Sequence, residues 1–160
     1  MITSGRDGVW NVLRVIATAA VVGVIASCGG GGAAPDEKIN GISVPPVPDS
    51  TANSTTISGV DSNGNGIRDD VDRVLATEFG QSAAAYQEAV SYARTQQAAL
   101  TLQTPTAIEN HIALLRCVRD PKKLEELQKI TLATLDAPIR KRAYATTFAG
   151  VLISKRGCQP

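Results

Sequence analysis

The hydrophobic positions in the second half of the chain recur with a helical period. From about Val60 onward, apolar residues fall three and four positions apart in five successive stretches, which predicts five amphipathic helices. The five stripes are Val71, Val74, Leu75 and Phe79; Tyr86, Val90, Ala93, Gln97 and Leu100; Ile108, Ile112 and Leu115; Leu124, Leu127, Thr131 and Leu135; and Tyr144, Phe148, Val151 and Leu152. No alternating apolar and polar run competes with this pattern. The sequence therefore predicts an all-α domain over residues 60–160, a small bundle of four to five helices.

Residues typical of helix ends separate these stripes. Gly80 is expected to end the first helix, and prolines are expected in the first turns of the third and fifth, at Pro105 and Pro138. Ser82 and Asp136 are expected to cap the second and fifth helices, Thr104 marks the start of the third, and Asp120-Pro121 is expected to break the third helix from the fourth.

Residues 28–59 have the composition of a flexible linker. A glycine run occupies positions 29–32, the segment Val44-Pro45-Pro46-Val47-Pro48 cannot continue a helix, and residues 50–58 are mostly serine and threonine. Such a stretch buries too little apolar surface to offset the entropy of ordering it. We therefore expect a disordered tether before the helical domain.

The amino-terminal 27 residues have the pattern of a signal peptide. Arg6 and Arg14 precede a run of 13 uncharged residues, 15–27. A bilayer-spanning helix needs about 20 apolar residues, so this run is too short to span comfortably and has the length of a signal-peptide core.

The residues that end this segment, Ile25-Ala26-Ser27-Cys28, resemble the lipobox of bacterial lipoproteins. The resemblance implies cleavage before Cys28 and acylation of that cysteine with lipid and a fatty acid such as palmitate, which would anchor the chain in the cell envelope. Gly29 stands where an aspartate tends to retain such proteins at the inner membrane, so the outer membrane is expected, on either its periplasmic or its surface face. An ordinary signal peptide ending near a cysteine is the alternative.

Two cysteines, Cys117 and Cys158, remain after the lipidated one. In an exported protein such a pair is expected to form a disulfide, which would close a loop of about 42 residues and stabilise the fold by roughly 4 kcal/mol. The alternative is a thiol nucleophile at Cys117 with His111 as its base, although six residues of separation do not place the two on one helical face.

Residues 61–72, DSNGNGIRDDVD, have oxygen-bearing side chains at the spacing of a calcium loop. Calcium takes six to eight oxygen ligands, and a glycine at the sixth position, here Gly66, permits the sharp turn that wraps a chain around the ion. The segment resembles EF-hand loops, and more closely those of thrombospondin type 3 and dockerin-like modules. Carried over by position, the resemblance implies side-chain ligands Asp61, Asn63, Asn65, Asp69 and Asp72, and a carbonyl ligand from Ile67.

The loop departs from the EF-hand pattern in ways that favour a single, weak, structural site. The last ligand position holds Asp72 rather than glutamate, the apolar residue is Ile67 at position 7 rather than 8, and no entering helix is expected. Three carboxylates and two amides predict an affinity nearer the 10⁻⁴–10⁻³ M range of extracellular modules. The alternative is a glycine turn followed by aspartates that cap the helix from about Asp70.

Charge and composition exclude several classes of function. The net charge of +1 excludes a polycationic nucleic-acid binder, and the single histidine excludes a multi-histidine metal centre. The charge divides into −6 over residues 28–109 and +6 over residues 110–160. The basic run Arg140-Lys141-Arg142 could therefore face an anionic envelope polymer or an envelope protein, or lie on a solvated helix face.

No catalytic constellation stands out. His111 is expected on a helix surface or at its edge, and Glu78 and Glu88 lack the features of a glycosidase pair. A non-catalytic structural or binding module is the expected function. The alternatives are a small envelope hydrolase using Asp or Glu, and an adaptor that binds an anionic partner through the basic carboxyl-terminal half.

Overall fold

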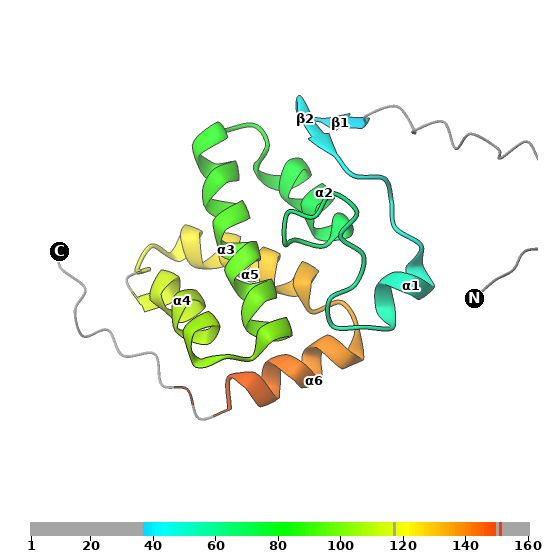
Figure 1. Ribbon diagram of the computed structural model, residues 1–160. Coiled ribbons are helices and arrows are strands. Elements are labelled where there is room, and N and C mark those ends of the chain that lie inside the picture. The colour runs from blue at the N-terminus through cyan, green and yellow to red at the C-terminus, as the bar shows by residue number, and fades with distance from the viewer. Residues whose placement is uncertain (1–36, 117, 150, 152–160) are drawn as a thin grey trace, which may run out of the picture. The chain divides into compact units, whose positions relative to one another are not determined.

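The computed structural model describes residues 37–116, 118–149 and 151 of the chain. This part holds six helices and one two-stranded sheet, so the predicted mainly helical fold is confirmed (Figure 1). The elements are β1 (Glu37–Ile39), β2 (Ile42–Val44), α1 (Ser50–Ser54), α2 (Asp69–Phe79), α3 (Ala83–Leu102), α4 (Pro105–Arg116), α5 (Pro121–Thr134) and α6 (Pro138–Thr147). None of these helices has both the length and the apolar character needed to cross a membrane.

Helices α2 to α5 correspond to the first four predicted stripes, whereas of the fifth stripe only Tyr144 lies within α6, which ends at Thr147. Side chains cap α3 and α5. The Ser82 hydroxyl accepts from Ala85 N at 3.4 Å, and the Asp120 carboxylate accepts from Lys122 N at 2.9 Å. The prediction for Asp136 is wrong. Ala137 is the N-cap of α6 and provides no side-chain cap, because the Asp136 carboxylate pairs with arginine side chains instead.

Helix α3 is the central element, in contact with α2, α4, α5 and α6 (Figure 1). Its apolar face packs against α2 and α5 to form the main core. Apolar side chains from all three helices and from the loop before α2 fill this core: Ile67, Val71, Leu75, Phe79, Ala89, Tyr92, Ala93, Leu127 and Ile130. The core therefore fixes the start of α2, where the candidate site lies.

The amino-terminal hairpin, which the sequence analysis did not predict, packs against α2. Its two-residue turn is Asn40-Gly41, and both residues have positive φ (52° and 81°), as a type I′ turn requires. The Asn40 amide donates to Ala76 O at 2.9 Å and to Thr77 O at 3.3 Å, two carbonyls in the last turn of α2. An Asn-Gly pair flanked by Ile39 and Ile42 was the signal in the sequence.

The expectation of a disordered linker is wrong for the residues from Glu37 to position 59. Val44 at the end of β2 is 6% exposed, and Asn53 in α1 is equally buried. The Asn53 side chain accepts from Val60 N at 3.0 Å, directly before the candidate loop. This segment therefore belongs to the folded domain, whereas residues 28–36 lie outside the described part of the chain.

Candidate calcium-binding loop

The predicted loop runs from Asp61 into the first turn of α2 and is closed by hydrogen bonds at its base. Asp69 N donates to Val60 O at 2.9 Å, and Ser62 N donates to the Asp69 carboxylate at 2.9 Å. Gly64 and Gly66 have φ of 68° and 84°, a conformation that favours glycine and allows the chain to reverse tightly. Positions 4 and 6 of the loop are thus glycines for a conformational reason.

The oxygen side chains of the first half of the loop turn inward onto the loop's own backbone. The two carboxylate oxygens of Asp61 accept from Asn65 N at 3.1 Å and Gly66 N at 2.9 Å. The amide oxygens of Asn63 and Asn65 accept from Asn65 N at 3.1 Å and from Ile67 N at 2.7 Å. These short-range bonds hold the predicted ligands on the concave side of the turn.

Asp72 reaches back from α2 to the same concave side. One of its carboxylate oxygens, Oδ2, accepts from the amide nitrogens of Asn63 at 3.1 Å and Asn65 at 2.7 Å. The other, Oδ1, is buried and has no hydrogen-bond partner, and the residue is 3% exposed. An unpartnered carboxylate oxygen at this depth carries a substantial desolvation cost, which a bound cation would remove.

The electrostatics of Asp72 point the same way. Burial raises the pKa of its carboxyl above the ordinary value; the amides of Asn63 and Asn65 oppose this rise, and the negative charges of Asp61 and Asp69 add to it. Asp69 is itself 1% exposed. The loop therefore gathers three carboxylates, and the surroundings of Asp72 disfavour its charged form.

Hydrogen bonds connect four of the predicted side-chain ligands, Asp61, Asn63, Asn65 and Asp72. The fifth, Asp69, accepts from Ser62 N, and Ile67 N donates to the Asn65 side chain. The Ile67 side chain is 1% exposed in the core, which anchors the second half of the loop. Within the described residues, no three acidic, cysteine or histidine side chains are arranged to hold a metal by themselves. The candidate site therefore depends on the amide oxygens and on the Ile67 carbonyl as well as on the aspartates.

Helix capping alone explains less of this arrangement. The N-cap of α2 is Arg68, which makes no side-chain cap hydrogen bond, while Asp69, Asp70 and Asp72 lie in the first turn. Their charges there favour the positive end of the helix dipole. The dipole gives no reason, however, for two asparagine amides to converge on Asp72.

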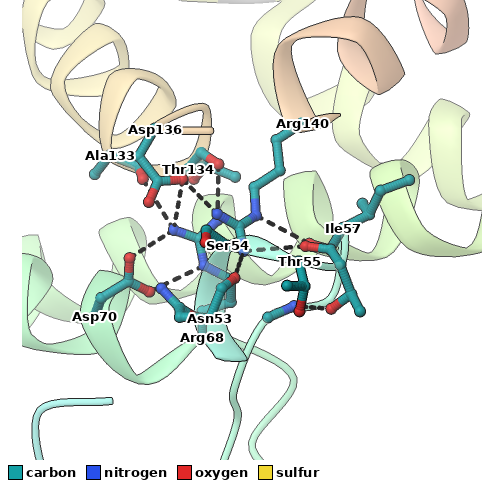
Figure 2. A network of polar contacts seen from close by, with 12 residues as sticks. Asn53, Ser54, Thr55, Ile57, Arg68, Asp70, Ala133, Thr134, Asp136 and Arg140 are labelled. Carbon is teal, nitrogen blue, oxygen red and sulfur yellow. Dashed lines mark hydrogen bonds and ion pairs between the residues drawn. The ribbon is translucent and has the colours of Figure 1, made fainter. Parts of the chain in front are cut away.

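Arg68 and Arg140, neither of which the sequence pattern assigned to the loop site, form a buried network beside the loop (Figure 2). Both side chains are 0% exposed. Arg68 makes a two-pronged ion pair with Asp70, with N–O distances of 2.9 and 2.6 Å, and Asp136 lies 3.1 Å from the same guanidinium. The sequence signal was the arginine at loop position 8, where EF-hand loops have an apolar residue.

Arg140 corrects the interpretation of the basic run as an exposed face. Its guanidinium lies 2.6 Å from Asp136 and donates to Ile57 O at 3.2 Å and to Thr56 O at 3.1 Å. It also donates to Asn53 O (Figure 2). The neighbouring Lys141 and Arg142 are exposed, so only they remain for an outside partner.

The prediction for His111 is wrong in a similar way. The imidazole is 0% exposed and lies between the rings of Tyr92 and Phe148, at centroid distances of 4.9 and 5.5 Å. Its Nδ1 is 3.3 Å from the Thr95 hydroxyl, and its Nε2 is buried without a partner. His111 is therefore a core residue that joins α3, α4 and α6.

Glu78 and Glu88, which the sequence does not pair as catalytic acids, make ion pairs outside the loop. Glu78 lies 3.7 Å from Lys129, and Glu88 pairs with Lys123. The lipidation residue Cys28 and the cysteine pair Cys117 and Cys158 lie outside the described residues.

The comparisons with known proteins found no matching family model, no matching curated protein and no matching solved structure.

Proposed function

We propose that this chain is a lipid-anchored module of the bacterial cell envelope, in which one calcium ion stabilises a small helical domain. The observation that carries the calcium part is the unpartnered, buried Oδ1 of Asp72, surrounded by the oxygen side chains of a loop with calcium-type spacing. The lipobox-like residues that end at Cys28 carry the anchor.

The chain's own residues fit a hard cation. Asp61, Asp69 and Asp72 provide carboxylates, and Asn63 and Asn65 provide amides that can turn either nitrogen or oxygen towards a neighbour. The Ile67 carbonyl completes the set of oxygen donors that the loop pattern predicts. A bound calcium ion would add positive charge among three neighbouring carboxylates, and we assign it a structural role.

The position of the loop indicates what such a site would accomplish. The loop connects the hairpin and α1 segment to α2, and its base is tied to that segment through Asn53 and Val60. Fixing the loop would fix the path by which an envelope tether enters the helical domain. An envelope protein or an anionic polymer is the proposed partner, and nucleic acid is not.

We expect calcium to raise the stability of the full chain, purified in detergent because of the expected anchor. With a Kd of about 10⁻⁴–10⁻³ M, 10 mM calcium adds about 1.5–3 kcal/mol to the free energy of unfolding, or a few degrees in Tm. Asp72→Asn keeps the shape and one acceptor of the side chain but removes its charge, so calcium should no longer raise Tm. Calorimetric titration and thermal unfolding, with and without EDTA, measure both effects.

Asp120→Asn is the matched control. It makes the same chemical change at an N-cap, where asparagine caps as well as aspartate does. It should respond to calcium like the wild type. Absence of binding to the wild type at 10 mM calcium, or an equal Tm increase in Asp72→Asn, would contradict the proposal.

The anchor makes a separate prediction. Cys28→Ser should abolish incorporation of labelled palmitate and should move the protein from the membrane fraction of a bacterial host to the aqueous fraction, because the lipobox-like segment then ends without a thiol to acylate. Cys158→Ser, which leaves the lipobox-like segment intact, is the control and should be labelled like the wild type. Equal labelling of Cys28→Ser and the wild type would contradict acylation at this position.

A further inference from the structure

Arg68 belongs both to the candidate loop and to the buried arginine network. We infer that calcium occupancy of the loop is coupled, through Arg68, to the docking of α6 and of the α1 segment. The inference rests on the proposed calcium site and adds a conformational consequence to it. Its basis is a closed circuit of contacts that begins and ends in the loop.

The first part of the circuit joins the loop to the end of α5. Arg68 stands between Ile67 and Asp69, so its backbone is fixed whenever those two neighbours are held. Its side chain, 0% exposed, donates to Thr134 O at 2.8 Å and to Ala133 O at 3.2 Å. These carbonyls belong to the last turn of α5, where a helix has no partners of its own for its carbonyl groups. The loop therefore provides the cap for α5.

The second part joins α5 to α6 and then to α1. Asp136, between the two helices, lies 3.1 Å from the Arg68 guanidinium and 2.6 Å from that of Arg140 (Figure 2). Arg140, the third residue of α6, donates in turn to the carbonyls of Asn53, Thr56 and Ile57. The Asp136 carboxylate thus pairs with two arginines, and each arginine forms its other hydrogen bonds with a different segment of the chain.

The circuit closes at the other end of the loop. The side chain of Asn53, whose backbone carbonyl accepts from Arg140, itself accepts from Val60 N at 3.0 Å. Val60 immediately precedes Asp61, the first predicted ligand. The loop is therefore held at its start by Asn53 and at its eighth position by Arg68, and both attachments lead to α6.

Such a circuit transmits displacement because both of its guanidinium groups, those of Arg68 and Arg140, are fully buried. A buried guanidinium that loses its acceptors incurs a large desolvation cost, so the network is either assembled or open, with little in between. A cation that fixes the loop backbone favours the assembled form. By thermodynamic reciprocity, opening the network from α6 must weaken calcium binding by the same factor as calcium favours docking.

The sign of the effect separates coupling from simple electrostatics. If only Coulomb's law acted, removing a positive charge near a cation site would leave the calcium affinity unchanged or make it higher. Coupling predicts the opposite for Arg140→Gln, a lower affinity by about five-fold or more. Arg142→Gln removes the same charge from the exposed face of the same helix and is the matched control. It should bind calcium like the wild type.

The experiment uses the full chain in detergent, with calcium as the only ligand. Calorimetry gives the calcium affinity of the wild type, Arg140→Gln and Arg142→Gln, and circular dichroism verifies that each variant is helical. Hydrogen exchange of the wild type, with calcium and with EDTA, needs no variant. We expect calcium to slow exchange within the loop and also in α6 and the last turn of α5.

The outcomes distinguish the two proposals. Slower exchange in the loop alone, with Arg140→Gln binding as tightly as the wild type, would overturn the coupling and leave the calcium site intact. Absence of calcium binding to the wild type would overturn both. If Arg140→Gln is unfolded, the wild-type exchange data decide, since protection of α6 by calcium supports coupling and its absence contradicts it.

Discussion

Replacement of Gly59 by alanine is expected to lower the free energy of unfolding by at least about 3 kcal/mol. Gly59 has φ of 64°, which an alanine adopts only with strain. An added Cβ would also lie 2.4 Å from Arg68 Cδ, 2.6 Å from Asn53 Oδ1 and 2.9 Å from Arg140 Nη2. None of these atoms can move freely, because each belongs to the buried circuit between the loop and α6. Urea unfolding in EDTA measures the loss without a contribution from calcium.

Gly64→Ala is the matched control for backbone strain. Gly64 has nearly the same φ, 68°, but a Cβ there would meet nothing within 4 Å. The free energy of unfolding of this variant should fall by only about 1–2 kcal/mol, the cost of the left-handed backbone conformation. If the two variants were equally destabilised, the close packing of the arginine network around Gly59 would be contradicted.

The helices could be predicted from sequence because their signals are local. The apolar stripes and the caps at Ser82 and Asp120 depend on residues at most a few positions apart. Asp136 has an equally good cap signal, yet it fails as a cap. Two arginines, one of them 68 positions earlier in the chain, compete for its carboxylate, and no local pattern reports that competition.

The hairpin and α1 were not predicted, because the composition of this segment is that of a linker and the only contrary indication was a short turn motif. Three-residue strands give almost no periodicity, and proline-rich flanks favour the interpretation as a linker. The Asn40-Gly41 pair was the one local indication of a hairpin. The hairpin is held instead by contacts with α2, such as Arg73 donating to Pro45 O at 2.9 Å.

The residues of the candidate loop could be predicted from the sequence, but the surroundings in which the fold places them could not. Its spacing indicated which oxygen side chains share the turn, since that geometry is fixed within twelve residues. The sequence could not indicate that Asp72 is buried with a free oxygen, nor that Arg68 points away from the turn into the protein. Both features depend on helices packed against the loop from distant positions.

Acidification from pH 7 to pH 4 is expected to cost the wild type about 3 kcal/mol more stability than it costs His111→Phe. Burial lowers the pKa of His111 from 6.5 to about 4 in the folded protein. Within this window the unfolded chain binds a proton that the folded chain excludes, so stability is complete above pH 6.5 and falls as the pH decreases. Phenylalanine removes the titration and suits the aromatic contacts with Tyr92 and Phe148.

The comparison isolates one group because His111 is the single histidine of the chain. The carboxyl groups, including that of Asp72 with its raised pKa, contribute equally to both proteins and cancel in the difference. Urea unfolding at several pH values gives the stabilities, and the NMR titration of the imidazole in the folded state gives the pKa directly. Parallel pH profiles for the two proteins, or an imidazole that titrates near pH 6.5, would mean that the junction of α3, α4 and α6 admits the charged ring.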